Sequence, residues 1–440
     1  MEMKKGNLWR SIWIYSVPLM FTNLLQLLFN IADVAIVGKF AGSISLGAVG
    51  STTLLISLTT GWLIGISNGV NAVVAFFAGA DERNQEQKAI QTGFLLCLAI
   101  GLIIFGAGFL WAEDILELLG TKDEFIWEAT RYFRIYMMGS PALAIFNYGN
   151  SVLSAEGNTK KPLNYLTISG VVNVVLNLYF VIGLHMTSEG VAYASIIAQY
   201  ISAALIIRAL LITKKNYRID VRNFSIDHKL SGKILKIGIP AALQYSLFAV
   251  ANLFVQSAVN SFDYVIVEGN SAAMNFDSIV YEMMAAFYIA CTSFVAQNYG
   301  ANQKERVRKT YFITTVYSFS IAVILGAVIH IFRTSLLYIF TNDAAVVSAG
   351  AIRLGILSIT YCLSAFMDNA TAACRGLGGT LIPTVIVLLG TIAFRIAWIY
   401  TVFEYFHTLE VLYLLYGCAF VITAVFQNLY LLKLYRKIFV

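Results

Sequence analysis

Four polar side chains share one face of the first long apolar segment of the chain. Asn23, Gln26, Asn30 and Asp33 are spaced three, four and three residues apart, which places them along one side of a helix. Asp33 is the only ionisable group among them. Because a charged side chain is costly to place inside a bilayer, such a residue is a candidate for ion or substrate binding. This face therefore suits the binding of a proton or a metal cation.

A second set of polar side chains lies in the fifth and sixth apolar segments. Asn173 and Asn177 are one helical turn apart, and Ser195 lies at a comparable depth. With Asp33 they offer a carboxylate, two amide oxygens and a hydroxyl, a set of ligands that suits Na⁺. A proton site on Asp33 alone is the other reading. The alternative to both is plain interhelical hydrogen bonding, which contributes about 0.6 kcal/mol a pair in membranes.

The C-terminal half of the chain carries its ionisable groups differently. Its first apolar segment has the polar residues Asn252, Gln256 and Asn260 but no acid. Further along the chain, the apolar segments contain three acids and one base: Asp277, Glu282, Asp368 and Arg395. Because an unpaired guanidinium is costly inside a membrane, we expect Arg395 to pair with one of these acids. Such a pair either forms part of a functional site or only fixes helix packing.

The composition indicates that the elements carrying these residues are membrane-spanning helices. Of the 440 residues, 59% are hydrophobic and only 12% are charged, about half the charged fraction of a soluble domain. Because backbone groups in lipid must be satisfied internally, we predict an all-α membrane protein. Its apolar runs of about 20 residues match the thickness of the hydrocarbon core. Twelve transmembrane helices are expected near residues 12–36, 47–78, 91–112, 131–153, 163–184, 190–212, 234–261, 270–298, 311–332, 349–373, 382–403 and 411–432. Pro18 and Pro141 fall inside them and favour kinks.

The second half of the chain repeats the first. A shift of 221 residues places Gly79-Ala80 on Gly300-Ala301, and Pro18 lies 222 residues before Pro240. We therefore expect two six-helix bundles related by a pseudo-two-fold axis along the membrane normal, an arrangement typical of transporters. The expected division is an N-terminal lobe at 1–212, a cytoplasmic linker at 213–233 and a C-terminal lobe at 234–440.

The distribution of basic residues predicts the orientation in the membrane. One set of alternate loops, with both termini, carries 23 Lys and Arg, whereas the other carries six, with Arg353 counted among the six. By the positive-inside rule, both termini are expected in the cytoplasm, as for a multi-pass protein of the cell (inner) membrane. The basic residues are scattered over seven segments, which argues against binding of nucleic acid. The first apolar segment has no cleavage site after it, so we interpret it as a span rather than a signal peptide.

Several classes of site are absent from the sequence. The five cysteines and four histidines lack the spacing of metal ligands or of redox pairs, so no cofactor and no zinc site are expected. No phosphate-binding glycine motif of the Walker type appears, so ATP is not the expected energy source. Paired catalytic histidines are also missing. We therefore do not expect an enzyme.

The chain resembles the multidrug and toxic compound extrusion (MATE) transporters over essentially its full length. The residues that carry the resemblance are Pro18-Leu19, Gln26, Asp33, Val37-Gly38, Leu46-Gly47-Ala48-Val49-Gly50, Tyr132-Phe133-Arg134-Ile135, Gly157-Asn158-Thr159-Lys160-Lys161-Pro162, Asn173 with Asn177, and Gly190-Val191-Ala192-Tyr193-Ala194-Ser195. The resemblance implies export of lipophilic organic cations in exchange for Na⁺ or H⁺. A lipid-linked or polysaccharide flippase of the same superfamily is the alternative. A monomer surrounded by membrane lipids is the expected state.

The resemblance also implies roles for single residues. Asp33 matches the cation-coupling acid of helix one, Gln26 and Tyr132 match polar residues near it, and Ser195 matches a helix-six hydroxyl. Pro18 matches a proline whose bend is tied to protonation. The sequence departs from the family at two positions. Asn177 replaces a frequent acid, which removes one negative charge from a Na⁺ cage, and Phe248 occupies a region where some members carry a coupling glutamate.

Overall fold

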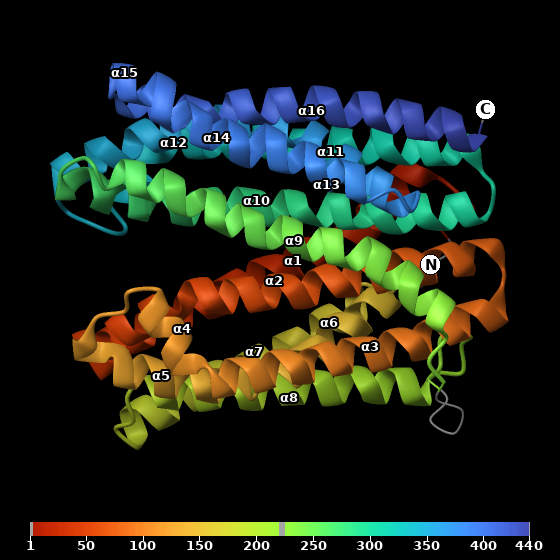
Figure 1. Cartoon of the computed structure of the whole chain (residues 1–440), viewed down its shortest axis with the longest axis horizontal. Coiled ribbons are helices and arrows are strands. Elements are labelled where there is room, and N and C mark those ends of the chain that lie inside the picture. The colour runs from red at the N-terminus through yellow and green to blue at the C-terminus, as the bar shows by residue number, and fades with distance from the viewer. Residues whose placement is uncertain (1–2, 220–224, 440) are drawn as a thin grey trace. The chain divides into compact units, whose positions relative to one another are not determined.

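The computed structural model describes residues 3–219 and 225–439, and every regular element within them is helical (Figure 1). This confirms the predicted all-α class. Eleven helices in the described ranges are long and apolar enough to cross a membrane. The twelfth predicted span, at 131–153, is built from two shorter helices, α5 (Asp123–Met137) and α6 (Ser140–Ala155). The predicted linker at 213–233 includes residues 220–224, which lie outside the described part of the chain.

The break between α5 and α6 corrects one prediction from the sequence. Pro141 was expected in the interior of a helix, where it would produce a kink. It instead occupies the second position of α6, where its missing N–H leaves no intrahelical hydrogen bond unmade. The chain ends one helix at Met137 and starts another at Ser140. Pro18, in contrast, does lie inside a helix, α1 (Leu8–Ile36).

The helices group into two compact units. The first, called here the N-unit, comprises Leu24–Ala242, and the second, called the C-unit, comprises Leu243–Val440 with the segment that ends at Asn23. Two long helices, α1 and α9 (His228–Val259), therefore contribute residues to both units. The division by chain order at 1–212, 213–233 and 234–440 stays a prediction.

The N-unit contains the following further elements: η1 (Val37–Ala41), α2 (Ser43–Ala80), α3 (Arg83–Leu110), α4 (Ala112–Leu118), α5, α6, α7 (Lys160–Leu178), η2 (Tyr179–Gly183) and α8 (Ser188–Ile212). The C-unit contains the following: α10 (Tyr264–Gly300), α11 (Lys304–Leu337), α12 (Ala344–Gly376), α13 (Leu381–Val387), η3 (Leu388–Ala393), α14 (Phe394–Trp398), η4 (Ile399–Phe403), α15 (Glu404–Phe406) and α16 (Leu409–Phe439). The η segments are π-helical, which means that their backbone hydrogen bonds join residues five apart rather than four apart as in an α-helix.

A Gly65-x-x-x-Gly69 motif in α2 lets the first half of α9 pack closely within the N-unit. A Cβ atom at Gly65 would lie 2.3 Å from the backbone nitrogen of Ala242. One at Gly69 would lie 2.4 Å from the carbonyl oxygen of Ile234. Because lipid tails are as apolar as the side chains, such close backbone packing is a main source of helix association in membranes. These two glycines therefore explain why α9 starts in the N-unit.

We expect Gly65→Ala to destabilise the protein, because a methyl group has no room against the α9 backbone. Overpacking of this kind costs about 1–3 kcal/mol, which corresponds to a fall of several degrees in melting temperature. The measurement is thermal unfolding of the purified protein. Gly50→Ala, on the same helix, is the matched control, since nothing lies within 4 Å of a Cβ at Gly50. Equal melting temperatures for the two variants would contradict the proposed packing.

The start of the chain is anchored in the C-unit. Arg306 donates hydrogen bonds to the backbone carbonyls of Met3 and Gly6, both at 3.0 Å. The Tyr15 hydroxyl donates to the Ser293 hydroxyl at 2.9 Å. Met3 and Tyr15 are fully buried in a cluster with apolar residues of α10. These contacts explain why the first half of α1 belongs to the C-unit.

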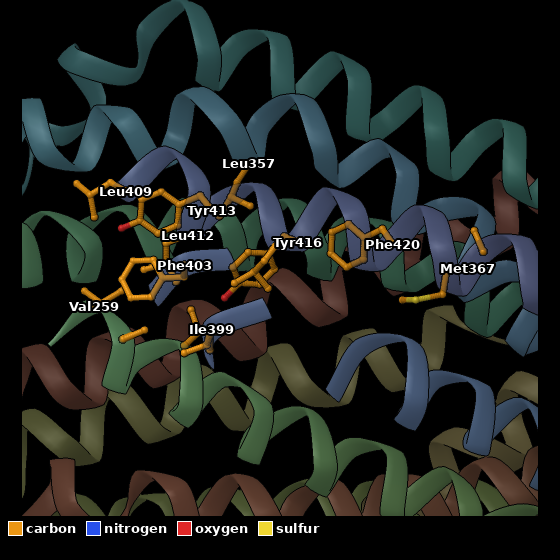
Figure 2. Packing of buried hydrophobic residues seen from close by; sticks show 14 residues of the cluster. Val259, Leu357, Met367, Ile399, Phe403, Leu409, Leu412, Tyr413, Tyr416 and Phe420 are labelled. Carbon is orange, nitrogen blue, oxygen red and sulfur yellow. The ribbon is translucent and has the colours of Figure 1, made fainter. Parts of the chain in front are cut away.

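A buried apolar cluster of the C-unit joins side chains from α9, α12, η4 and α16. Figure 2 shows the aromatic rings of Phe403, Tyr413, Tyr416 and Phe420 within it. Three of these residues come from α16, where spacings of three and four place them on one face. Tyr413 and Tyr416 also carry polar hydroxyl groups, so this cluster borders the polar groups of the C-unit described below.

Candidate functional site

Four polar side chains of the N-unit form a closed ring of hydrogen bonds. The two carboxylate oxygens of Asp33 accept from the Asn177 amide at 2.5 Å and from the Ser195 hydroxyl at 3.1 Å. The Asn173 amide donates to Ser195 and its oxygen accepts from Asn177, both at 3.3 Å. The structure thus brings together the four residues that the sequence singled out as an oxygen cage.

Three helices position this ring, and the spacing of its residues explains the arrangement. Asp33 comes from α1, Asn173 and Asn177 from α7, and Ser195 from α8. The two asparagines lie one turn apart, so both amides point from the same face of α7. Both are buried, as is Ser195, which leaves the carboxylate of Asp33 as the more accessible member.

The two helices that carry Asp33, Asn173 and Asn177 both become π-helical shortly after these residues. The α1 helix changes to η1 at Val37, four residues after Asp33, and α7 changes to η2 at Tyr179, two residues after Asn177. These two π-helical segments contact each other. Single π-helical turns inside α-helices are found frequently at functional sites. The apolar pattern of the sequence carries no signal that could have predicted them.

A close approach of α1 and α7 sets the distance between Asp33 and the asparagines. A Cβ atom at Gly170 would overlap the phenyl ring of Phe29. The absence of a side chain at residue 170 therefore allows this phenyl ring to lie directly against α7. Gly170 precedes Asn173 by one turn, and Phe29 precedes Asp33 by one turn. The contact therefore lies one helical turn from the hydrogen-bonded ring and sets the distance between α1 and α7 there.

The ring contains one formal negative charge and no positive one. Asp33 is its only acid, and no group of three His, Cys, Asp or Glu that could hold a metal ion exists in the described ranges. The Asn177 side-chain oxygen is buried and accepts no hydrogen bond in the structure. Because amide and carboxylate oxygens are the ligands that Na⁺ prefers, the ring suits either one such cation or one proton on Asp33.

The other residues predicted for this site lie outside the hydrogen-bonded ring. Gln26 is half-buried and Asn30 is exposed, and neither side chain makes a hydrogen bond within the described residues. Asn23, on the same predicted face, donates to the backbone oxygen of Glu282 at 3.0 Å and belongs to the C-unit. Tyr132 is buried against Ile36 and Val37 at the end of α1. Of the polar face predicted on the first helix, Asn23 therefore belongs to the C-unit, whereas Asp33 belongs to the hydrogen-bonded ring of the N-unit.

The buried ion pair of the C-unit joins Arg353 and Asp277. The Arg353 Nε atom donates to Asp277 Oδ2 at 2.8 Å, and its Nη1 atom donates to the side-chain oxygen of Asn270 at 2.7 Å. From the sequence, Arg353 was expected among the loop residues. This is wrong, because α12 begins at Ala344 and the Arg353 side chain is only 3% exposed.

The pairing expected for Arg395 is also corrected. Its guanidinium Nη1 donates to the side-chain oxygen of Asn252 at 3.0 Å and to no carboxylate in the described ranges. Asp277 is already bound by Arg353, which comes from a different helix. Glu282 and Asp368 form no ion pair with a described basic residue. Side-chain direction around a helix decides such pairings, and the sequence alone did not provide it.

Comparison with known proteins supports a common origin of the two halves. A family model described as MatE matches residues 18–179 and again residues 240–401, so both matches begin at a proline, Pro18 and Pro240. A Bacillus subtilis protein described as probable multidrug resistance protein YoeA is 25% identical over 393 residues, which cover 88% of this chain and 85% of the relative. A second B. subtilis protein, probable multidrug resistance protein YpnP, is 28% identical over 70% of this chain and 68% of its own length.

The fold is also that of a solved structure. The chain is similar to a structure described as the outward-facing conformation of a multidrug resistance MATE family transporter, with a TM-score of 0.93. The match covers 99% of this chain and 98% of the other at 21% identity. At this identity the likeness shows the fold alone.

Proposed function

Because the chain belongs to the MatE family of multidrug and toxic compound extrusion transporters, we propose that it is a secondary antiporter that exports lipophilic organic cations. The coupling ion is Na⁺ or H⁺, bound at Asp33. The observation that carries this proposal is the closed ring of Asp33, Asn173, Asn177 and Ser195, which holds one negative charge inside a membrane-spanning unit.

The single charge of the ring gives it two states. When Asp33 is ionised, its oxygens accept from Asn177 and Ser195, and the site retains a negative charge that attracts a cation. Binding of a proton or Na⁺ neutralises the site and weakens its attraction for a cationic cargo. Exchange of one monovalent cation for one proton or Na⁺ moves no net charge, so the concentration gradient of the coupling ion drives it. The membrane potential adds about 2.3 kcal/mol per 100 mV for each further charge that moves with the coupling ion. Exchange of one cation for another at this acid therefore needs no ATP.

The proposed location of the protein is the cell membrane. The excess of Lys and Arg in alternate loops favours a multi-pass protein of the cell membrane with both termini in the cytoplasm. We propose a monomer that acts as a transporter rather than as an enzyme. A flippase for lipid-linked or polysaccharide cargo is the alternative on this scaffold. The names of the relatives favour efflux of drugs over that alternative.

Ethidium accumulation in cells that lack other efflux pumps tests the proposal. Cells that express the chain are expected to accumulate less ethidium than control cells, and this difference should disappear when the driving ion gradient is removed. Varying external Na⁺ at constant pH, and pH at constant Na⁺, identifies which ion drives transport. Dye exclusion that depends on neither gradient would contradict the proposed antiport.

We expect Gly170→Ala to reduce efflux, because a methyl group at this position would displace Phe29 or push α7 away from α1. Either change separates Asp33 from its partners on α7. The double variant Gly170→Ala with Phe29→Ala should recover most of the activity, since the smaller side chain at residue 29 makes room for the methyl group. Val171→Ala is the control, as this side chain is exposed. Full efflux by Gly170→Ala alone would contradict the role of this contact.

A further inference from the structure

Arg395 is a buried cation whose hydrogen bonds are incomplete. Its side chain, from the short helix α14, is 2% exposed. Nη1 donates to the Asn252 oxygen at 3.0 Å, but the buried Nε has no acceptor within the described residues. A guanidinium carries five N–H donors in a rigid plane, and buried donors are nearly always paired in folded proteins. The described surroundings of Arg395 thus leave its Nε–H donor without an acceptor.

The charges around Arg395 do not balance either. The neighbouring Arg353 is paired with Asp277. The ring of Tyr416 contacts both arginines, with its centre 4.5 Å from the guanidinium carbon of Arg395 and 5.6 Å from that of Arg353. Figure 2 shows Tyr416 within the apolar cluster of the C-unit, near Ile399. Tyr416 therefore contacts two buried arginines, of which only Arg353 has a carboxylate partner in the described residues.

Stacking on Tyr416 relieves only part of this imbalance. A cation over an aromatic face is stabilised by the ring quadrupole. An aromatic face, however, is a weaker acceptor for an N–H group than an oxygen atom or an anion. The unpaired Nε requires an acceptor at the edge of the guanidinium. An anion is the acceptor that satisfies both the hydrogen bond and the charge.

Asn252 holds Arg395 from an accessible part of α9. It is exposed, and its side-chain oxygen accepts from Arg395 Nη1. About one turn further along α9 and η4 lies a pocket of about 160 Å³, whose walls include Phe254, Ser257 and Ile399. Arg395 is therefore buried close to an accessible stretch of α9.

The local backbone provides an independent indication of a functional site. The described residues contain four π-helical segments. Two of them, η1 and η2, follow Asp33 and Asn177 at the ring of the N-unit. The other two, η3 and η4, directly flank the short helix that carries Arg395. Because such segments are frequent at functional sites, their positions single out Arg395 in the C-unit as they single out Asp33 in the N-unit.

We propose that Arg395, held in place by Asn252, binds a singly charged anionic group, either a halide ion or a carboxylate. The edge of the guanidinium opposite Asn252 supplies the unpaired Nε–H donor and the positive charge, and Asn252 fixes the other edge by accepting from Nη1. A guanidinium fork matches a carboxylate in two parallel hydrogen bonds, and it also binds a spherical halide. This site lies in the C-unit and is separate from the cation site proposed at Asp33.

Thermal unfolding of the full-length protein in different anions tests this proposal. Sodium methanesulfonate, whose weakly basic, singly charged anion is a poor hydrogen-bond acceptor, is replaced by sodium chloride or by sodium acetate at constant Na⁺ and ionic strength. Chloride or acetate is expected to raise the melting temperature by about 2–4 °C in a saturable manner. A response to chloride alone assigns a free halide, and a response to acetate assigns a carboxylate group. A response to neither overturns the proposal.

Variants connect this response to the proposed residues. Arg395→Gln and Asn252→Ala are expected to remove or weaken the anion response, whereas Arg308→Gln, at an exposed arginine of the same unit, should keep it. In methanesulfonate, Arg395→Gln should be at least as stable as the wild type, because the uncompensated charge is gone. An unchanged response in Arg395→Gln overturns the proposal. Should Arg395→Gln fail to fold, Arg395→Lys takes its place, because lysine keeps the charge but lacks the Nε–H donor. An anion response of unchanged size in Arg395→Lys overturns the proposal.

The proposal is independent of cation coupling at Asp33. The variant Asp33→Asn is expected to retain the full anion response, because Asp33 belongs to the N-unit. Loss of transport in Asp33→Asn together with loss of the anion response in Arg395→Gln supports both proposals. An anion response that disappears in Asp33→Asn would overturn the assignment of this site to Arg395.

Discussion

Asp33→Asn is expected to abolish ion-driven efflux while leaving the protein folded. Asparagine has nearly the same shape as aspartate and can still accept from Asn177 or Ser195, but it carries no charge and binds no proton. The site then remains permanently in its neutral state. We expect efflux to fall by about tenfold or more, the range of a typical coupling free energy between two ligands.

Two control variants separate the charge of Asp33 from general effects. Asp114→Asn, at an exposed acid of the same unit, should leave efflux unchanged. Asn177→Ala removes one of the two donors to Asp33 but keeps the charge, so it should reduce efflux less than Asp33→Asn does. Resistance and ethidium exclusion at wild-type levels in Asp33→Asn would show that the coupling acid lies elsewhere.

Asp277→Asn is expected to cause the largest loss of stability, because it leaves the Arg353 guanidinium buried without its anion. Breaking a buried ion pair by removal of one partner costs about 3–5 kcal/mol. We expect the melting temperature to fall by about 5–10 °C. Replacing both residues, as in Asp277→Asn with Arg353→Met, should be less destabilising than Asp277→Asn alone, since no charge is then left unpaired.

An exposed ion pair provides the comparison for this prediction. Arg134 and Glu113 approach to 3.5 Å, and their side chains are 39% and 60% exposed. Surface pairs of this kind contribute about 0–1 kcal/mol, so Glu113→Gln should hardly change the melting temperature. Similar effects of Asp277→Asn and Glu113→Gln, measured by thermal unfolding of the purified protein, would contradict a structural role of the buried pair.

The sequence was sufficient for the fold because lipid restricts the choice of structure. Apolar runs of about 20 residues predict helices, and the positions of charged loops separate them. The prediction failed only where the backbone is interrupted within an apolar run. At 131–153 the chain forms α5 and α6 instead of one kinked helix, because Pro141 starts a helix more readily than it continues one.

The polar ring of the N-unit was predictable for a similar reason. Asn173 and Asn177 lie one turn apart and must share a face of α7, and Asp33 is an acid that requires partners inside a membrane. The pairing in the C-unit was not predictable. Arg353 and Arg395 come from different helices, and their rotation around the helix axes decides which one reaches Asp277. Spacing along a single helix does not determine this rotation.

The π-helical segments and the sharing of α1 between two units had no signal in the sequence. A π-helical turn differs from an α-helical turn by a single hydrogen-bond register, and the same apolar residues fit both. The N-terminal half of α1 joins the C-unit through contacts such as those of Tyr15 and Arg306 with distant residues. Such long-range contacts depend on the assembled fold rather than on local pattern.

Exchange of ions for ethidium in proteoliposomes tests the central claim most directly. The purified full-length chain is reconstituted, and a Na⁺ gradient or a proton gradient directed out of the vesicles is imposed separately. We expect one of these gradients to drive ethidium into vesicles that contain the wild type, and neither to do so with Asp33→Asn. Equal gradient-driven uptake by the wild type and Asp33→Asn, or no uptake by the wild type under either gradient, would contradict cation-coupled export through Asp33.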